Sequence, residues 1–423
     1  MASVGDLQKA LIPNNQTALI EYFVGDSSVF VFSLLQNDLI LNELPKTKDF
    51  EKQIEALRTE ITEHKTVHDA TNFDAQSYAL YRYLLKQTLD TLPKNLNQLI
   101  IVPDGVLNYL PFDVLVETAP SVFLLNDKHE VGMSNVSKRT KDAKNVKGMD
   151  SRKSSKDSSF TVHHSSLQKD SSFVVHHSSL TKSFKKSKFI LWHYIISYAY
   201  SANLLLEQKG MKKDAPELFA GFASKYTSQD TTFADVSKTR ATLSRAGAYE
   251  LPSAKEEVNK ISTILGGKVF LNELSTEGVF KTEANRYKIL HFAMHSLTDD
   301  KDASLSHLLF TLTPQDTTND NEGEGVMSLA RAFFHAGVPS TVTSLWEVDD
   351  SKTRDIMIDF YKNLKNGKAK DEALTKAKRD YLDNMTESGT ANPYFWAGFV
   401  PIGNMCSARP QRVKTGSVPS GVR

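Results

Sequence analysis

The segment "LPSAKEEVNKISTILGGKVFLNELSTEGVFKTEANRYKILHFAMHS", residues 251–296, decides the fold because helical and extended patterns alternate along it. The two helical stretches begin near Pro252 and Thr276, and Gly266 gives the first a stop. Each is followed by a short apolar run of β type, "KVFLNE" and "YKILHFAMHS". Strands that alternate with helices of this length need right-handed crossovers, so the segment predicts a mostly parallel sheet flanked by helices.

The same α/β alternation continues on both sides of this segment. The run "ELFAGFAS" at 217–224 predicts a strand before it. After it we expect a helix at 327–338, a strand at 339–348, helices at 351–367 and 370–382, and a strand at 394–403. Functional groups in such sheets gather at the carboxyl ends of the strands.

The amino-terminal part has a different pattern. "TALIEYFVGDSSVFVFSLLQNDLILNELP", residues 17–45, contains aromatic and β-branched runs around a Gly-Asp-Ser-Ser turn, which predicts a β-meander. Apolar residues at spacings of three and four predict helices at 50–63 and 75–92. Residues 96–116 then predict a buried strand, a Pro-Asp-Gly turn and a further extended piece.

Between 127 and 188 the composition changes to Ser, Lys and His, which predicts a disordered insert. Two tandem copies of one motif, at 156–168 and 169–181, are too few and too polar for a solenoid. The copies contain paired histidines, His163, His164, His176 and His177, which could bind a transition metal. We expect instead that the repeat is disordered. The chain therefore divides into 1–126, the insert, 189–404 and an unstructured tail at 405–423.

Composition limits the possible functions. The 51 basic and 50 acidic side chains of the 423 residues give a net charge of +1, so no overall field favours nucleic acid. The chain starts without a secretory signal, and its most apolar stretch, 189–206, carries polar side chains that disfavour a membrane span. A single cysteine, Cys406, rules out an internal disulfide and indicates a reducing, cytoplasmic setting. We expect neither a metal nor a cofactor.

His295 is the candidate catalytic residue. It ends the strand pattern at 287–296, beside Ser296 and an acidic run at 298–302, where it could act as a general base for a thiol or hydroxyl. His291 lies four residues earlier on the same face, and we expect it to be a packed, hydrogen-bonded core residue.

A second candidate is the carboxylate cluster at the end of the strand "LWEV". Glu347, Asp349 and Asp350 could bind a basic substrate side chain, and Asp349 or Asp350 could instead cap the helix that follows.

Several motifs resemble the CHAT domain, a caspase-like cysteine peptidase family related to caspases and separase and often fused to tetratricopeptide repeats in bacteria. They are "ILHFAMHS", "EGEGVMSLARAFFHAGVPSTVTSLWEVDDSKT", "FYKNLKNGKAKDEALTKAK", "NPYFWAGFVPIGN", "PDGVLNYLPFDVLV", "SYAYSANLLLEQ" and "LPSAKEEVNKI". The resemblance implies that His295 is the second histidine of a His-x-x-x-His-Gly motif, with Ser296 in the glycine position. It also implies a peptide or protein ligand, including a partner that contains tetratricopeptide repeats.

The chain departs from the family where the nucleophile is expected. The family has a central strand that ends on the catalytic cysteine before a Gly-Glu-Gly segment, whereas here 308–321 runs directly into "EGEGVMSLARAFF". Without that strand, two strand edges are exposed, or 291–296 and 341–348 pair directly. Cys406 lies in the tail, where a flexible end does not hold a base and a thiolate together.

Three functions follow from this departure. The first is a catalytically inactive homologue that acts as an interaction or regulatory domain. The second is a decayed or truncated gene product without function. The third is an active cysteine endopeptidase that uses Cys406.

Overall fold

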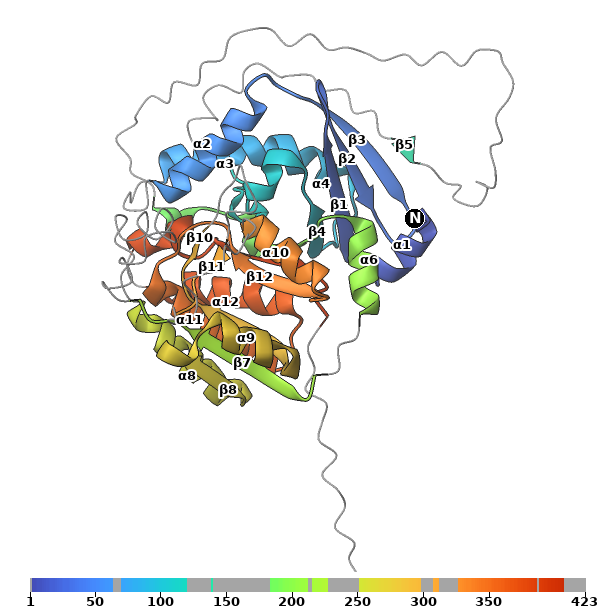
Figure 1. Ribbon diagram of the computed structural model, residues 1–423. Helices are drawn as coiled ribbons and strands as arrows, with labels where there is room; N and C mark the ends of the chain where they lie inside the picture. The colour runs from blue at the N-terminus through green and yellow to red at the C-terminus, as the bar shows by residue number, and fades with distance from the viewer. Residues whose placement is uncertain are drawn as a thin grey trace, which may run out of the picture. The chain divides into compact units, whose positions relative to one another are not determined.

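The computed structural model describes residues 2–63, 70–119, 138–139, 183–211, 215–226, 251–297, 307–311, 326–385 and 388–406. The chain divides into two compact units (Figure 1). The first unit comprises Met1–Gly210, Val342–Glu347 and Leu382–Asn404, and the second comprises Met211–Thr341, Val348–Tyr381 and Met405–Arg423. The division of the chain into four segments, which we predicted from composition and resemblance, stays a prediction.

An eight-stranded sheet with the order β12-β13-β6-β4-β1-β2-β3-β5 forms the centre of the first unit. β1, β2 and β3 are antiparallel, so the predicted β-meander is confirmed. β1, β4, β6 and β13 run parallel to their neighbours in that series. The strands are β1 Thr17–Val24, β2 Ser28–Leu34, β3 Leu39–Pro45, β4 Gln98–Val102, β5 Lys138–Arg139, β6 Ile195–Tyr198, β12 Ser340–Ser344 and β13 Phe399–Gly403.

The helices predicted after the meander are present. α2 covers Phe50–Thr62, and a continuous helical segment runs from α3, Thr71–Tyr81, through a π-helical turn at Arg82–Lys86 to α4, Gln87–Thr91. The first unit also contains α1, Val4–Leu11, and α6, Ala202–Gly210. Ser3 and Asp6 form a capping box at the start of α1, which satisfies two backbone N–H groups that the helix leaves free.

One predicted element of this region is wrong. After β4 the chain forms short 3-10 helices at Gly105–Tyr109 and Phe112–Val114, where we expected an extended piece. Gly105 has a positive φ of 56°, and Pro111 interrupts the segment, so the chain turns repeatedly. Among the described residues, the strand-like pairing of this segment is an isolated bridge between Val116 and Phe189. The apolar run nevertheless fills the core.

The end of the predicted insert belongs to the core. Phe184 lies in a 3-10 helix at Phe184–Lys186, is 2% exposed, and its ring centroid lies 5.4 Å from that of Phe73. Residues 183–188, which we expected to be disordered, are described by the structure, and the buried Phe184 ring fixes the backbone that carries it. The four repeat histidines, His163, His164, His176 and His177, lie outside the described residues.

The second unit contains a parallel sheet with the order β8-β7-β9. Its strands are β7 Glu217–Ala223, β8 Lys268–Leu271 and β9 Tyr287–Ala293, and a small sheet pairs β10, Ser296–Leu297, with β11, His307–Leu308. Among the residues that the structure describes, further helices are α8 Pro252–Leu265, α9 Glu277–Glu283, α10 Val326–His335, α11 Asp350–Lys365 and α12 Lys370–Asn384. The predicted α/β class, a mostly parallel sheet flanked by helices, is confirmed.

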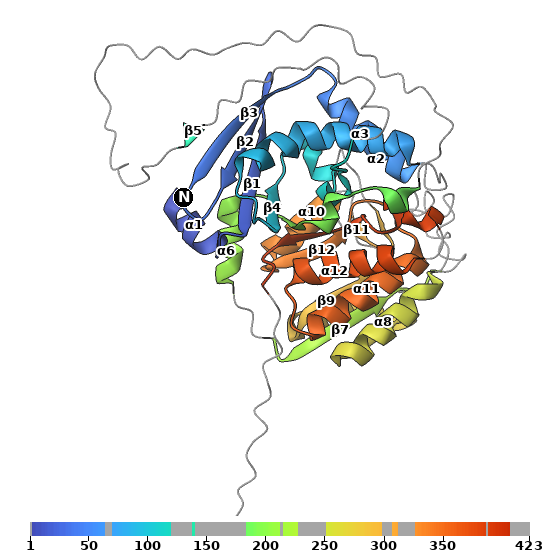
Figure 2. The same ribbon diagram turned by 180° about the vertical axis from the view of Figure 1, so that it is seen from behind.

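Helices cover both faces of the sheet of the second unit (Figures 1 and 2). On one face Phe222 of β7 packs against α9 and the neighbouring strands. On the other face Gly221 lies under α8, and a Cβ atom there would stand 2.4 Å from Val258 Cγ1. Glycine at this position therefore allows helix and strand to approach closely.

β9 and β12 belong to different sheets, and each stands at one end of its sheet. Of the two predicted arrangements, direct pairing is therefore not the one that forms. Each strand keeps the ladder it shares with its own neighbour, β7 for β9 and β13 for β12. The side chains of both strands are mostly half-buried, whereas the carboxyl-terminal part of β7 is buried.

The apolar stretch at 189–206 is divided among several elements. Ile190–Trp192 form a 3-10 helix, β6 follows, and α6 begins at Ala202. Among the residues that the structure describes, none of the helices combines the length and the apolar character that crossing a bilayer requires.

Candidate functional site at the carboxyl end of β7 and β9

His295 lies two residues beyond the end of β9. Its backbone N–H donates to Tyr226 Oη at 3.0 Å, and Tyr226 Oη donates to the Leu309 carbonyl at 2.8 Å. The amide of Leu309 in turn donates to the His295 carbonyl at 2.9 Å. These bonds tie the ends of β7 and β9 to the β11 segment and fix the backbone on both sides of His295.

Tyr226 also contacts the imidazole. The two ring centroids lie 4.9 Å apart, with an interplanar angle of 54°. The His295 side chain is half-buried, and Ser296 is exposed at the start of β10. Sequence reasoning missed Tyr226, although the tyrosine follows the predicted strand at 217–224. Because carboxyl ends of adjacent parallel strands meet, the topology alone could have placed it beside His295.

The prediction that His291 is a packed core residue is confirmed. His291 Nε2 lies 2.8 Å from Glu257 Oε1, and its Nδ1 lies 3.2 Å from Tyr361 Oη. The imidazole also stacks on the Phe219 ring, at 6.3 Å between centroids. The His291 and Glu257 side chains are only 11% and 5% exposed. We call Glu257, His291 and Tyr361 the histidine triad, and it joins α8, β9 and α11.

The chemistry of the triad assigns the protons. Burial, and then the Glu257 charge, raise the pKa of the Tyr361 hydroxyl, so this group is neutral and donates. If it donates to His291 Nδ1, the imidazole proton is on Nε2 and points at the Glu257 carboxylate. Every polar group of the triad then has a partner, which identifies it as a structural support beneath the strand that leads to His295.

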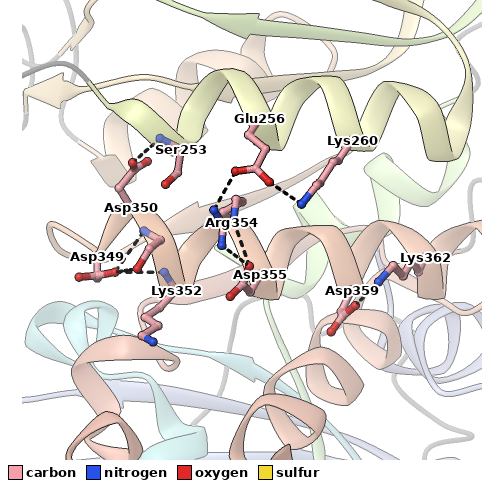
Figure 3. A network of polar contacts seen from close by, with 11 residues as sticks. Ser253, Glu256, Lys260, Asp349, Asp350, Lys352, Arg354, Asp355, Asp359 and Lys362 are labelled. Atoms are coloured by element: carbon pink, nitrogen blue, oxygen red, sulfur yellow. Dashed lines mark hydrogen bonds and ion pairs between the residues drawn. The ribbon is translucent and has the colours of Figure 1, made fainter. Parts of the chain in front are cut away.

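The carboxylate cluster at the start of α11 caps two helices (Figure 3). Asp349 Oδ1 accepts from the backbone N–H groups of Ser351 and Lys352 at 3.1 and 3.0 Å. Burial alone would raise the pKa of the Asp349 carboxyl, but these hydrogen bonds and that of the Ser351 hydroxyl outweigh it and leave the pKa below its ordinary value. Asp349 thus caps the start of α11, which is one of the two uses predicted for it.

Asp350 caps a different helix. Its Oδ2 accepts from the backbone N–H of Ser253 at 2.7 Å, at the start of α8. The N-cap residue of α8, Leu251, makes no side-chain capping bond. Arg354 Nη1 of α11 also lies 2.9 Å from Glu256 Oε2 of α8, and this ion pair adds a second contact between the two helices. Glu347, the third carboxylate of the cluster, is exposed.

Replacing Asp350 with alanine is expected to lower the free energy of unfolding by about 1 kcal/mol, because the start of α8 loses its acceptor. Urea denaturation followed by circular dichroism measures the change. Asp350→Asn is the matched control, because it keeps a side-chain oxygen that can accept, and it should cost less than half as much. An unchanged unfolding midpoint for Asp350→Ala would show that the Ser253 contact contributes nothing.

Cys406 is exposed and forms no disulfide. Its carbonyl accepts from Lys370 Nζ at 2.8 Å, and the Lys370 amide donates to the Met405 carbonyl at 3.1 Å. The first two residues of the predicted tail are therefore anchored at the start of α12, while 407–423 lie outside the described residues. In the described part of the chain, no group of three or more His, Cys, Asp or Glu side chains is arranged to hold a metal.

The mostly parallel sheets flanked by helices define an α/β protein of the caspase-like class. The sequence profile described as "CHAT domain" matches residues 74–322 and 313–404, so the chain belongs to the CHAT domain family. The two matched segments overlap at residues 313–322.

One relative is a protein named for its tetratricopeptide repeats. Tetratricopeptide repeat protein 28 of Homo sapiens is 24% identical over a region that covers 36% of this chain and 8% of the relative. The chain therefore matches only a small part of that protein's length.

Proposed function

We propose that this chain is a catalytically inactive CHAT-domain protein that acts as an interaction or regulatory domain. The observation that carries the proposal is the position of the single cysteine, Cys406, which comes after the last strand of the chain. The family instead has its nucleophilic cysteine at the end of a central strand. Without a positioned thiolate, the bond-forming step of a cysteine peptidase has no attacking atom. Loss of a nucleophile removes most of an enzyme's rate enhancement.

His295 keeps the position of the general base in this proposal. The Tyr226 and Leu309 contacts fix its backbone, which is what a base beside a nucleophile requires. Ser296 replaces the glycine of the family motif, and it removes the freedom of the backbone at that point. His295 is then half of a catalytic pair, retained in a domain that binds and does not cleave.

The ligand of this domain is a peptide or protein, and a protein with tetratricopeptide repeats is the proposed partner. Glu347 is exposed and is the carboxylate best suited to a basic side chain of such a ligand. Asp349 and Asp350 each use one oxygen for capping, and their second oxygens are the proposed additional acceptors. A net charge of +1 provides no overall field that favours nucleic acid, and the exposed thiol suits a reducing, cytoplasmic setting.

Thiol labelling tests the proposal. A peptidyl acyloxymethyl ketone should label the wild-type chain and His295→Ala at rates within about twofold, since a working base contributes on the order of 100-fold or more. Cys406→Ser is the control that shows how much labelling comes from the exposed thiol. Labelling of Cys406 that falls at least tenfold in His295→Ala would instead identify an active cysteine peptidase. A chain that unfolds without a cooperative transition would favour a decayed product.

A further inference from the structure

The outward side of the β-meander carries an unusual surface. Residues paired across strands share a face, so Glu21, Phe32 and Leu41 form one row, and Phe23, Phe30 and Glu43 form the next. We call these six residues the outer meander face. The opposite face of the same three strands is buried in the core of the first unit by Ile20, Tyr22, Val29, Val31, Ile40 and Leu44.

Helices cover the adjoining row on the same side of the sheet. Leu19, Leu34 and Leu39 pair across the three strands, and they pack in one cluster with residues of α1 and α6. Leu7, Ala10 and Leu11 of α1 belong to that cluster. Helices α1 and α6 thus cover the row of side chains that lies beside the outer meander face.

The outer meander face lacks such a cover among the described residues. Phe23 is 58% exposed, Phe32 37% and Leu41 40%. Six large apolar side chains are exposed to this degree in the described part of the chain, and three of them lie on this face. The Phe23 and Phe30 rings also contact each other, at 6.4 Å between centroids. A grouping of this kind marks an interaction surface, whereas single exposed apolar residues do not.

The two charged side chains among these six residues have one sign; beyond them, Lys138 of β5 is the backbone partner of Leu41 at the edge of the same row. The two are Glu21, opposite Phe32, and Glu43, opposite Phe30. Glu43 Oε1 accepts from the Ser28 hydroxyl at 2.7 Å. Burial raises the pKa of the Glu21 carboxyl, which shows that its charge is poorly solvated and would gain from a cation. A second copy of these six residues would bring carboxylates and apolar rows together with no cation among them.

We propose that the outer meander face binds an amphipathic helix of a partner protein whose apolar stripe is flanked by lysine or arginine. This proposal rests on the proposed function as an interaction domain. Two rows of strand residues stand about 7 Å apart, and with their side chains they fit one helix of about 10 Å diameter. Aromatic residues suit the centre of such an interface, and the carboxylates select for basic residues at its rim.

A pair of synthetic helical peptides tests the proposal on the full chain. Both carry the same leucine stripe, one flanked by lysine and the other by glutamate, and fluorescence anisotropy measures their binding. The lysine peptide should bind at least about tenfold more tightly, a difference of about 1.4 kcal/mol. Phe32→Asp should weaken its binding by a similar factor. Leu274→Asp, at a side chain that is 62% exposed in the second unit, is the control and should change nothing.

A second variant tests the proposal even if Phe32→Asp does not fold. The double substitution Glu21→Gln and Glu43→Gln keeps shape and removes charge, so it should abolish the preference for the lysine peptide. Equal binding of both peptides, or binding that neither variant weakens, would overturn the proposal. Light scattering that detects a dimer lost in Phe32→Asp would also overturn it, because the occupant would then be a second copy. Histidine-dependent labelling would sink the proposed function while leaving a positive peptide result in place.

Discussion

Replacing Phe222 with alanine is expected to lower the free energy of unfolding by about 3 to 5 kcal/mol, the range for truncating a buried phenylalanine. Phe222 is 0% exposed and lies at the centre of the sheet of the second unit. Its ring stacks on Phe270 and Phe292, with centroids at 4.8 and 5.5 Å, and meets Phe280 and Phe310 edge-on. Few neighbours can move into the space, because four of them are rings held by each other.

Urea denaturation followed by fluorescence measures the loss at Phe222. Phe222→Leu keeps most of the volume and should cost about 1 to 1.5 kcal/mol. Phe23→Ala is the exposed control, at 58% exposure, and should stay within about 0.5 kcal/mol of the wild type. A Phe222→Ala variant no less stable than Phe23→Ala would show that the aromatic cluster does not hold the second unit together.

Replacing Glu257 with alanine is expected to cost about 2 to 3 kcal/mol. The substitution removes the acceptor that lies 2.8 Å from His291 Nε2, and it leaves a donor without a partner in a site whose side chains are 11% and 5% exposed. An unsatisfied buried polar group loses its full desolvation free energy, about 1 to 3 kcal/mol, and the lost packing of the glutamate stem adds to it.

The control for this prediction is Glu257→Gln, which keeps a side-chain oxygen that can accept from Nε2 and should cost clearly less. Combining Glu257→Ala with His291→Ala tests whether the two residues act together. Since they share one hydrogen bond, the double substitution should cost about 1 to 2 kcal/mol less than the sum of the single ones. Strict additivity, measured by urea denaturation, would rule out the triad as a unit.

Local patterns predicted most of the elements of the second unit correctly. The apolar run at 217–224, the cap at Thr276 and the stop at Gly266 depend on residues within one or two turns of each other. The prediction of an extended piece after β4 was wrong, because an apolar run without a partner strand can also form short 3-10 helices. The polar residues around Phe184 gave no local sign that its side chain is buried.

The sequence by itself therefore determined the class of fold, the family and a position for His295 close after a strand, because periodicity, caps and family motifs are properties of neighbouring residues. Only the tertiary structure decided what surrounds that position. Tyr226 meets His295 across 69 residues, and Asp350 caps α8 across 97. The sharing of one sheet by β1, β4, β6 and β13 is of the same kind. Such contacts depend on the path of the chain between distant segments, and no local pattern records that path.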